Sequence, residues 1–127
     1  PDGFSDAKFV EQATPAAATN VYYVSGFTIS GEMLEKAKKF VEAYKAKYKE
    51  EPSMFAALAY DSVYMAAEAA KGAKTSVDIK DNLAKLKDFD GVTGSITIDK
   101  DHNPVKTALM IGLKDGQVDT VETVKAE

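Results

Sequence analysis

The chain contains no cysteine and only one histidine, His102, and both shortages narrow the chemistry open to it. Without cysteine there is no disulfide, no thiol nucleophile and no cysteine-ligated zinc site. One histidine cannot supply the two or three imidazoles of a typical histidine metal site. His102 also lies in a polar stretch without a second catalytic group at a fixed spacing. We therefore expect it to be an exposed turn residue.

Clustered positive charge is also missing. The 127 residues carry a formal net charge of −4, and the lysines form no local patch. Because nucleic-acid phosphates require local positive charge, we predict that the chain has no nucleic-acid partner. Hydrophobic residues make up 45% and charged residues 28%, which is typical of a soluble globular protein of one domain.

Long hydrophobic runs are absent as well. The longest uncharged stretch, residues 12–31, contains Pro15 and Asn20, so it is better interpreted as a strand with its loops than as a membrane span. No charged segment followed by an apolar one marks a signal peptide. The chain begins with Pro1 instead of methionine, and we interpret it as a processed or truncated product. The missing signal therefore does not locate the protein.

The usual catalytic and metal-binding motifs are not present. Residues 99–103 begin like a calcium loop, but the sixth position is Pro104 and the twelfth is Met110, where glycine and an acid are required. A polar hairpin turn is the simpler interpretation. The chain has no G-x-S-x-G nucleophile elbow, and residues 91–94 lack the phosphate-loop pattern. We predict no catalytic residues, no metal and no cofactor.

The most prominent stretch is an alanine-rich helix predicted between Ser53 and Gly72. Ser53 can cap its first turn, and Gly72 can end it in a left-handed conformation. Apolar side chains fill nearly the whole circumference, which predicts a buried helix around which the other elements pack. In that interpretation, a charge introduced at Val63 or Ala67 prevents folding.

Three charged residues interrupt this apolar surface: Asp61, Glu68 and Lys71. Asp61 and Glu68 are seven residues apart and therefore lie on nearly the same helix face, about 10 Å apart along the axis. That separation is too large for a cooperating acid pair. We interpret them as a narrow solvent-facing stripe.

Three elements are predicted before this helix. Ser5 can cap a short helix that ends near Ala13. Residues 20–25 form a short, continuously apolar strand, which is typical of a strand buried on both faces in a parallel sheet. Residues 32–50 form a long amphipathic helix with an apolar stripe at three- and four-residue spacing.

After the central helix the pattern changes from helical to extended. Thr75 and Asp78 are placed like a capping box for a helix over residues 77–87. Strands are then predicted over residues 92–99, 105–113 and 118–124, with Asp115-Gly116 as a tight turn before the last one. Successive strands joined by short turns predict an antiparallel β-meander.

This order of elements, together with five sequence segments, resembles one family. The segments are residues 40–52, 55–69, 86–99, 103–106 and 114–116. They are similar to the C-terminal part of branched-chain amino-acid-binding proteins, the substrate-binding components of ABC importers with the type I periplasmic-binding-protein fold. The resemblance is greatest to streptococcal members. It covers the whole chain but only about a third of such a protein.

The resemblance implies an α/β fold class: a C-terminal segment of a two-lobed fold with a buried strand, three main helices and a β-meander. It implies that residues 1–25 and 111–127 belong to the C-terminal lobe and residues 26–110 to the N-terminal lobe. The N-terminal lobe's own sheet and the strands that flank residues 20–25 are absent from this sequence. We therefore expect that the chain by itself binds none of these ligands detectably.

Two residues match ligand contacts of the family. The resemblance implies that Asp2 binds the ligand's ammonium group and that Phe55 packs on its aliphatic side chain. From the residues alone, the simpler interpretation is that Asp2 is a turn aspartate and Phe55 a core phenylalanine. The family's carboxylate-binding groups precede Pro1 and have no counterpart here.

The expected function is therefore that of a binding module for leucine, isoleucine or valine, which closes its lobes on the ligand and catalyses no reaction. The resemblance implies an ABC permease as partner and an extracytoplasmic location, as a cell-surface lipoprotein or in the periplasm. The alternatives are a sensor or receptor domain of the same fold for another small amino acid or an amide, and an α/β enzyme. Because its apolar strand lacks neighbours, we also expect the isolated chain to self-associate.

Overall fold

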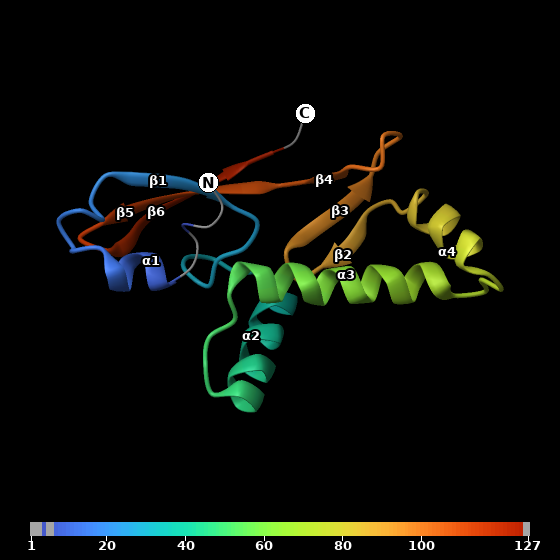
Figure 1. The fold of residues 1–127 in the computed structure, drawn as a ribbon, viewed down its shortest axis with the longest axis horizontal. Coiled ribbons are helices and arrows are strands. Elements are labelled where there is room, and N and C mark those ends of the chain that lie inside the picture. Colours follow the sequence, from blue (N-terminus) through green and yellow to red (C-terminus); the bar gives the residue numbers. More distant parts are fainter. Residues whose placement is uncertain (1–3, 5–6, 126–127) are drawn as a thin grey trace.

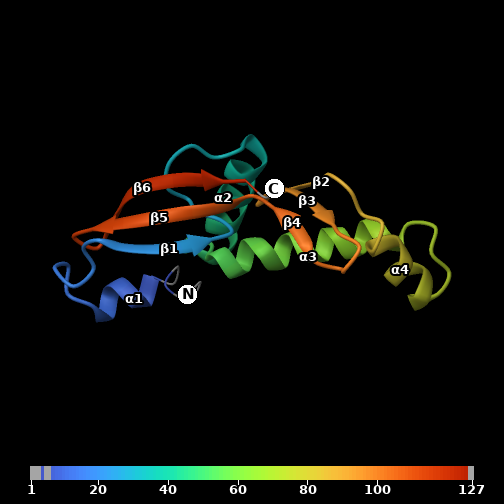
Figure 2. The same ribbon diagram turned by 90° about the horizontal axis from the view of Figure 1, so that it is seen from above.

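The computed structural model describes residue 4 and residues 7–125. Two three-stranded sheets lie one after the other along the long axis of the molecule (Figures 1 and 2). The helix α1 (Ala7–Gln12) lies beside the first sheet, and α3 (Met54–Ala70) runs beneath the second (Figure 1). The helix α2 (Glu35–Tyr48) projects away near the start of α3, and α4 (Ser76–Leu83) lies at the far end. This mixture of helices and sheets confirms the predicted α/β class.

The first sheet has the order β1-β5-β6 and is antiparallel throughout. It contains β1 (Val21–Ser25), β5 (Ala108–Lys114) and β6 (Gln117–Val124). Asp115 and Gly116 join β5 to β6 with φ angles of 50° and 75°, as the predicted tight turn requires. The prediction of a strand buried on both faces in a parallel sheet is wrong. Within the described residues β1 is an antiparallel edge strand, and Tyr22 on its outer face is 63% exposed.

The second sheet has the order β2-β3-β4 and contains β2 (Phe89–Gly91), β3 (Gly94–Ile98) and β4 (Pro104–Lys106). The predicted strand over residues 92–99 starts too early, because Val92 and Thr93 form the turn of a β2–β3 hairpin. The predicted strand over residues 105–113 is also wrong. It is two strands, separated at Thr107, where the chain passes from one sheet to the other.

The N-terminal caps predicted for α3 and α4 are confirmed, and Ser5, the cap predicted for the first helix, lies outside the described residues. The hydroxyl of Ser53 accepts a hydrogen bond from the backbone N–H of Ala56, at the start of α3. Thr75 and Asp78 form a reciprocal capping box at the start of α4. The long amphipathic helix α2 begins at Glu35, three residues later than predicted, and ends at Lys49 in a left-handed conformation.

The main hydrophobic cluster forms where α2 and α3 meet the connection after β1 and the β2–β3 turn. Its members are Phe27, Ala37, Phe40, Val41, Met54, Ala57 and Val92. No helix among residues 7–125 is long and apolar enough to cross a membrane.

The predicted burial of α3 on nearly all sides is wrong for this chain. Val63 is 67% exposed, Ala67 is exposed as well, and a charge at either position would remain in water. The predicted solvent stripe is also wrong, since Asp61 is only 2% exposed while Glu68 is exposed and pairs with Lys71. Periodicity marks which helix faces are apolar, but the neighbouring elements decide which of them are covered.

Candidate functional site

The buried carboxylate of Asp61 holds the β2–β3 turn against α3. One of its oxygens, Oδ1, accepts a hydrogen bond of 2.7 Å from the backbone N–H of Val92. The other, Oδ2, accepts bonds from the backbone N–H and the hydroxyl of Thr93, at 2.9 and 2.7 Å. Hydrogen bonds to an ionised acceptor are stronger than neutral ones, so these three bonds compensate the desolvation of the carboxylate. Gly91 is required beside it, because a Cβ there would lie 2.5 Å from Oδ2.

A lysine extends this network toward the first sheet. The ammonium of Lys106, at the end of β4, donates to the Thr93 hydroxyl at 2.8 Å and to the backbone carbonyl of Gly26 at 3.1 Å. Thr93 therefore accepts from Lys106 and donates to Asp61. Burial lowers the pKa of Lys106, and the nearby Asp61 carboxylate opposes that shift.

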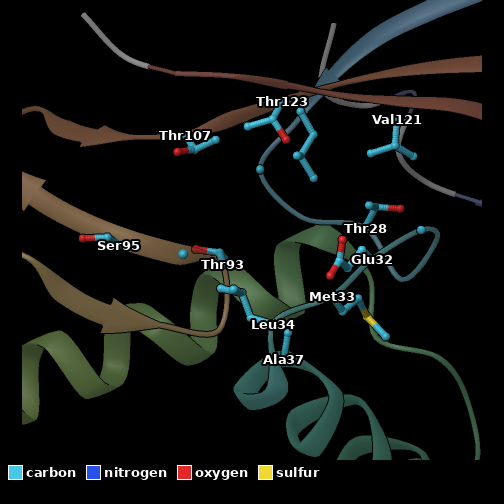
Figure 3. Close-up of a pocket in the computed structure, with 14 residues that line it drawn as sticks. Thr28, Glu32, Met33, Leu34, Ala37, Thr93, Ser95, Thr107, Val121 and Thr123 are labelled. Carbon is cyan, nitrogen blue, oxygen red and sulfur yellow. The ribbon is translucent and has the colours of Figure 1, made fainter.

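A cavity of about 650 Å³ lies between the two sheets, next to this network (Figure 3). Val121 and Thr123 of β6 lie across it from Leu34 and Ala37, at the start of α2. The residues with polar side chains in its lining are Thr28, Glu32, Thr93, Ser95, Thr107 and Thr123. Such a lining can hydrogen-bond a small polar molecule, and the volume suits one.

A second cavity, of about 750 Å³, lies at the start of α3. Phe4 lines it together with Ser53 and Met54, at the start of α3. Asp2 precedes Phe4 by two positions but lies outside the described residues. Phe55 follows Met54 and is 50% exposed, so it is not a core residue of this chain. The structure thus places Phe4 near the start of α3, and the pairing of Asp2 with Phe55 stays a prediction.

Residues 99–103 form the predicted polar turn. The carboxylate of Asp99 accepts hydrogen bonds from the backbone N–H groups of Asp101 and Asn103, and the bond from Asn103 contributes most to lowering the Asp99 pKa. His102 is exposed in this turn with a φ of 67°. Within residue 4 and residues 7–125, no three His, Cys, Asp or Glu side chains are grouped so that they could hold a metal ion.

Analysis of the sequence missed the roles of Asp61, Thr93 and Lys106. A single carboxylate within an apolar helix, and a Gly-Val-Thr-Gly turn elsewhere, were both visible. Nothing in the sequence pairs them, however, since Asp61 and Thr93 are 32 residues apart.

The model of the periplasmic binding protein family matches residues 3–117. The chain belongs to the periplasmic binding protein family. No curated protein matches it.

Solved structures of this family give the same result. The chain is 58% identical to the branched-chain amino acid transporter substrate-binding protein LivJ from Streptococcus pneumoniae, solved in complex with isoleucine. The TM-score is 0.89, and the match covers 98% of this chain and 36% of that one. The leucine-binding protein LivK from Thermotoga maritima is 27% identical, with a TM-score of 0.83 over the same shares of the two chains. The predicted resemblance to streptococcal members is confirmed.

More distant members share the fold alone. A solute-binding protein of an ABC transporter from Rhodopseudomonas palustris, in complex with benzoate, is 21% identical with a TM-score of 0.68, over 87% of this chain and 32% of that one. The named relatives are substrate-binding proteins rather than enzymes. This periplasmic binding protein chain spans about a third of the length of each.

Proposed function

We propose that this chain is part of the substrate-binding component of an ABC importer for leucine, isoleucine or valine. The observation that carries the proposal is the 58% identity, over 98% of the chain, to a protein solved with isoleucine. The leucine-binding neighbour agrees with the same ligand class. The protein would bind the amino acid by closing two lobes and would catalyse no reaction.

The proposed ligand contacts are Asp2 and Phe55. A carboxylate in a closing cleft favours the ammonium group of an amino acid, because electrostatic attraction strengthens as water is excluded. The half-exposed ring of Phe55, in the first turn of α3, is available to an aliphatic side chain. The groups that would bind the ligand's carboxylate belong to the part of the relatives that this chain does not span.

Each proposed lobe contains one of the two sheets. Residues 1–25 would belong to the C-terminal lobe, and α2, α3 and α4 with β2, β3 and β4 would belong to the N-terminal lobe. From the sequence we place the return to the C-terminal lobe at residue 111. The separation of β4 from β5 at Thr107 supports a return four residues earlier.

Family membership also supports an ABC permease as partner and an extracytoplasmic location, in the periplasm or as a cell-surface lipoprotein. Self-association of the isolated chain stays a prediction, motivated by the edge position of β1 and by the exposed apolar face of α3.

Isothermal titration tests the proposal. The chain is joined to the remaining part of the streptococcal relative and titrated with leucine, isoleucine and valine. Asp2→Asn should weaken binding at least about tenfold, because the ammonium loses its charged partner. Phe55→Ala should cost less affinity for valine than for leucine, since leucine offers the ring more area.

The matched control is Asp119→Asn, which removes an exposed carboxylate on β6 and should leave binding unchanged. Failure to bind any of the three amino acids would refute the branched-chain proposal. Binding of an amide or another small amino acid instead would favour the sensor alternative. Unchanged affinity in Asp2→Asn would remove Asp2 from the site.

A further inference from the structure

Among residues 7–125, two connections join the first sheet to the second sheet and its helices. Residues 26–34 lead from β1 to α2, and Thr107 leads from β4 to β5. Any relative motion of the two sheets must be absorbed by backbone rotation in these connections, because the strands themselves are held by their ladders. A contact that ties one connection to the other therefore influences that motion directly.

Lys106 makes such a contact. Its ammonium reaches the carbonyl of Gly26, the first residue of the first connection, while its own backbone adjoins Thr107 in the second. It also binds the Thr93 hydroxyl, which Asp61 holds in turn. A single side chain thus links both connections to the buried turn on α3.

The surroundings of Gly26 fit this arrangement. Its N–H lies 3.1 Å from the Met54 sulfur, so both of its peptide groups are held. A Cβ at this position would come within 3.4 Å of both the Lys106 ammonium and the Leu58 side chain. An added Cβ would thus meet both groups at van der Waals distance, so Lys106 and Leu58 pack directly against residue 26.

We propose that Lys106 is the positioning residue of a hinge between the two sheets, an inference that rests on the proposed ligand-binding closure. Its long side chain fixes the separation of the two connections while their backbone angles remain free to rotate. Lys106 is half-buried, which limits the competition from water for its two hydrogen bonds. The two sheets then rotate about one axis instead of several.

Loss of this contact should give the connections additional conformations that ligand binding must remove. In the joined protein described above, Lys106→Met should weaken isoleucine binding about tenfold, the factor that corresponds to ordering roughly one residue of backbone. Lys100→Met, which removes an exposed lysine paired with its neighbour Asp101, is the matched control and should leave affinity unchanged.

A second experiment needs no ligand. Because the chain has no cysteine, spin labels can be placed uniquely at Asp119→Cys on β6 and Lys85→Cys after α4. Pulsed electron paramagnetic resonance then reports the distribution of distances between the first sheet and the segment that leads from α4 into the second sheet. Lys106→Met should broaden this distribution, and Lys100→Met should not. If Lys106→Met does not fold, Lys106→Gln, which keeps a polar but shorter side chain, should show the same broadening.

A pair of labels within the first sheet, at Lys114→Cys and Val124→Cys, separates a hinge role from general loosening. If this pair broadens as much as the pair between the sheets, or if neither pair broadens, the inference about Lys106 is wrong. If only the pair between the sheets broadens, Lys106 positions the hinge. That result stands even when the joined protein binds no branched-chain amino acid, an outcome that would refute the proposed function alone.

Discussion

Replacing Asp61 by asparagine is the sharpest test of the reasoning about α3. The substitution preserves the shape of the side chain but exchanges one carboxylate oxygen for an NH₂ group. Only one oxygen then remains for the three donors of Val92 and Thr93. Whichever way the amide is oriented, at least one backbone N–H faces the NH₂ group, which is another donor. Water cannot replace the lost acceptor, because Asp61 is only 2% exposed.

The expected cost follows from this geometry. Losing the charge on a hydrogen-bonded acceptor removes part of a bond that contributes about 1.5–3 kcal/mol, and an unsatisfied buried N–H costs about 1–3 kcal/mol. Since the two effects overlap, Asp61→Asn should lower the free energy of unfolding by about 2–4 kcal/mol. That is a large part of the roughly 5–15 kcal/mol that stabilises a domain.

Urea unfolding followed by circular dichroism measures this difference. Glu68→Gln is the control, because Glu68 lies on the same helix but is exposed and pairs only with Lys71. An exposed pair of this kind contributes about 0.5 kcal/mol or less. The reasoning is refuted if the two variants unfold at the same urea concentration, since equal effects would return Asp61 to the solvent-facing stripe.

Two further predictions concern α3 and α4. Val63→Asp should leave the unfolding midpoint of this chain nearly unchanged, while Ala57→Asp, at a fully buried position, should prevent folding. Similar circular dichroism melts for both would contradict the observed burial. The backbone N–H of Lys74, followed by the groups of Thr75, lowers the pKa of Asp78. The ionised Asp78 therefore stabilises the folded state at pH values above its ordinary pKa. The difference in urea stability between wild type and Asp78→Asn should shrink as the pH falls below about 4. A difference that stays constant with pH would contradict this role of the Asp78 carboxylate.

Local signals in the sequence determined the caps of α3 and α4, the Asp115-Gly116 turn and the helical or extended character of most segments, although they did not predict β2. They could do so because a cap or a tight turn depends on residues within about four positions of one another. The resemblance to the periplasmic binding proteins was also visible in the sequence, since it rests on residue identities along the chain.

The tertiary structure alone decided which apolar faces are covered and where the strands pair. The continuous apolar stretch at residues 21–24 is compatible with either a central or an edge strand. It is an edge strand here because, among the described residues, β1 pairs with β5 on one side only. The sequence pattern predicts that Asp61 faces solvent, but in the structure it is buried. The hydrogen-bond donors that hold its carboxylate come from the β2–β3 turn, which begins 31 residues later at Val92. Lys106 reaches Gly26 across 80 residues. Contacts over such separations depend on how the elements pack, and no local pattern encodes them.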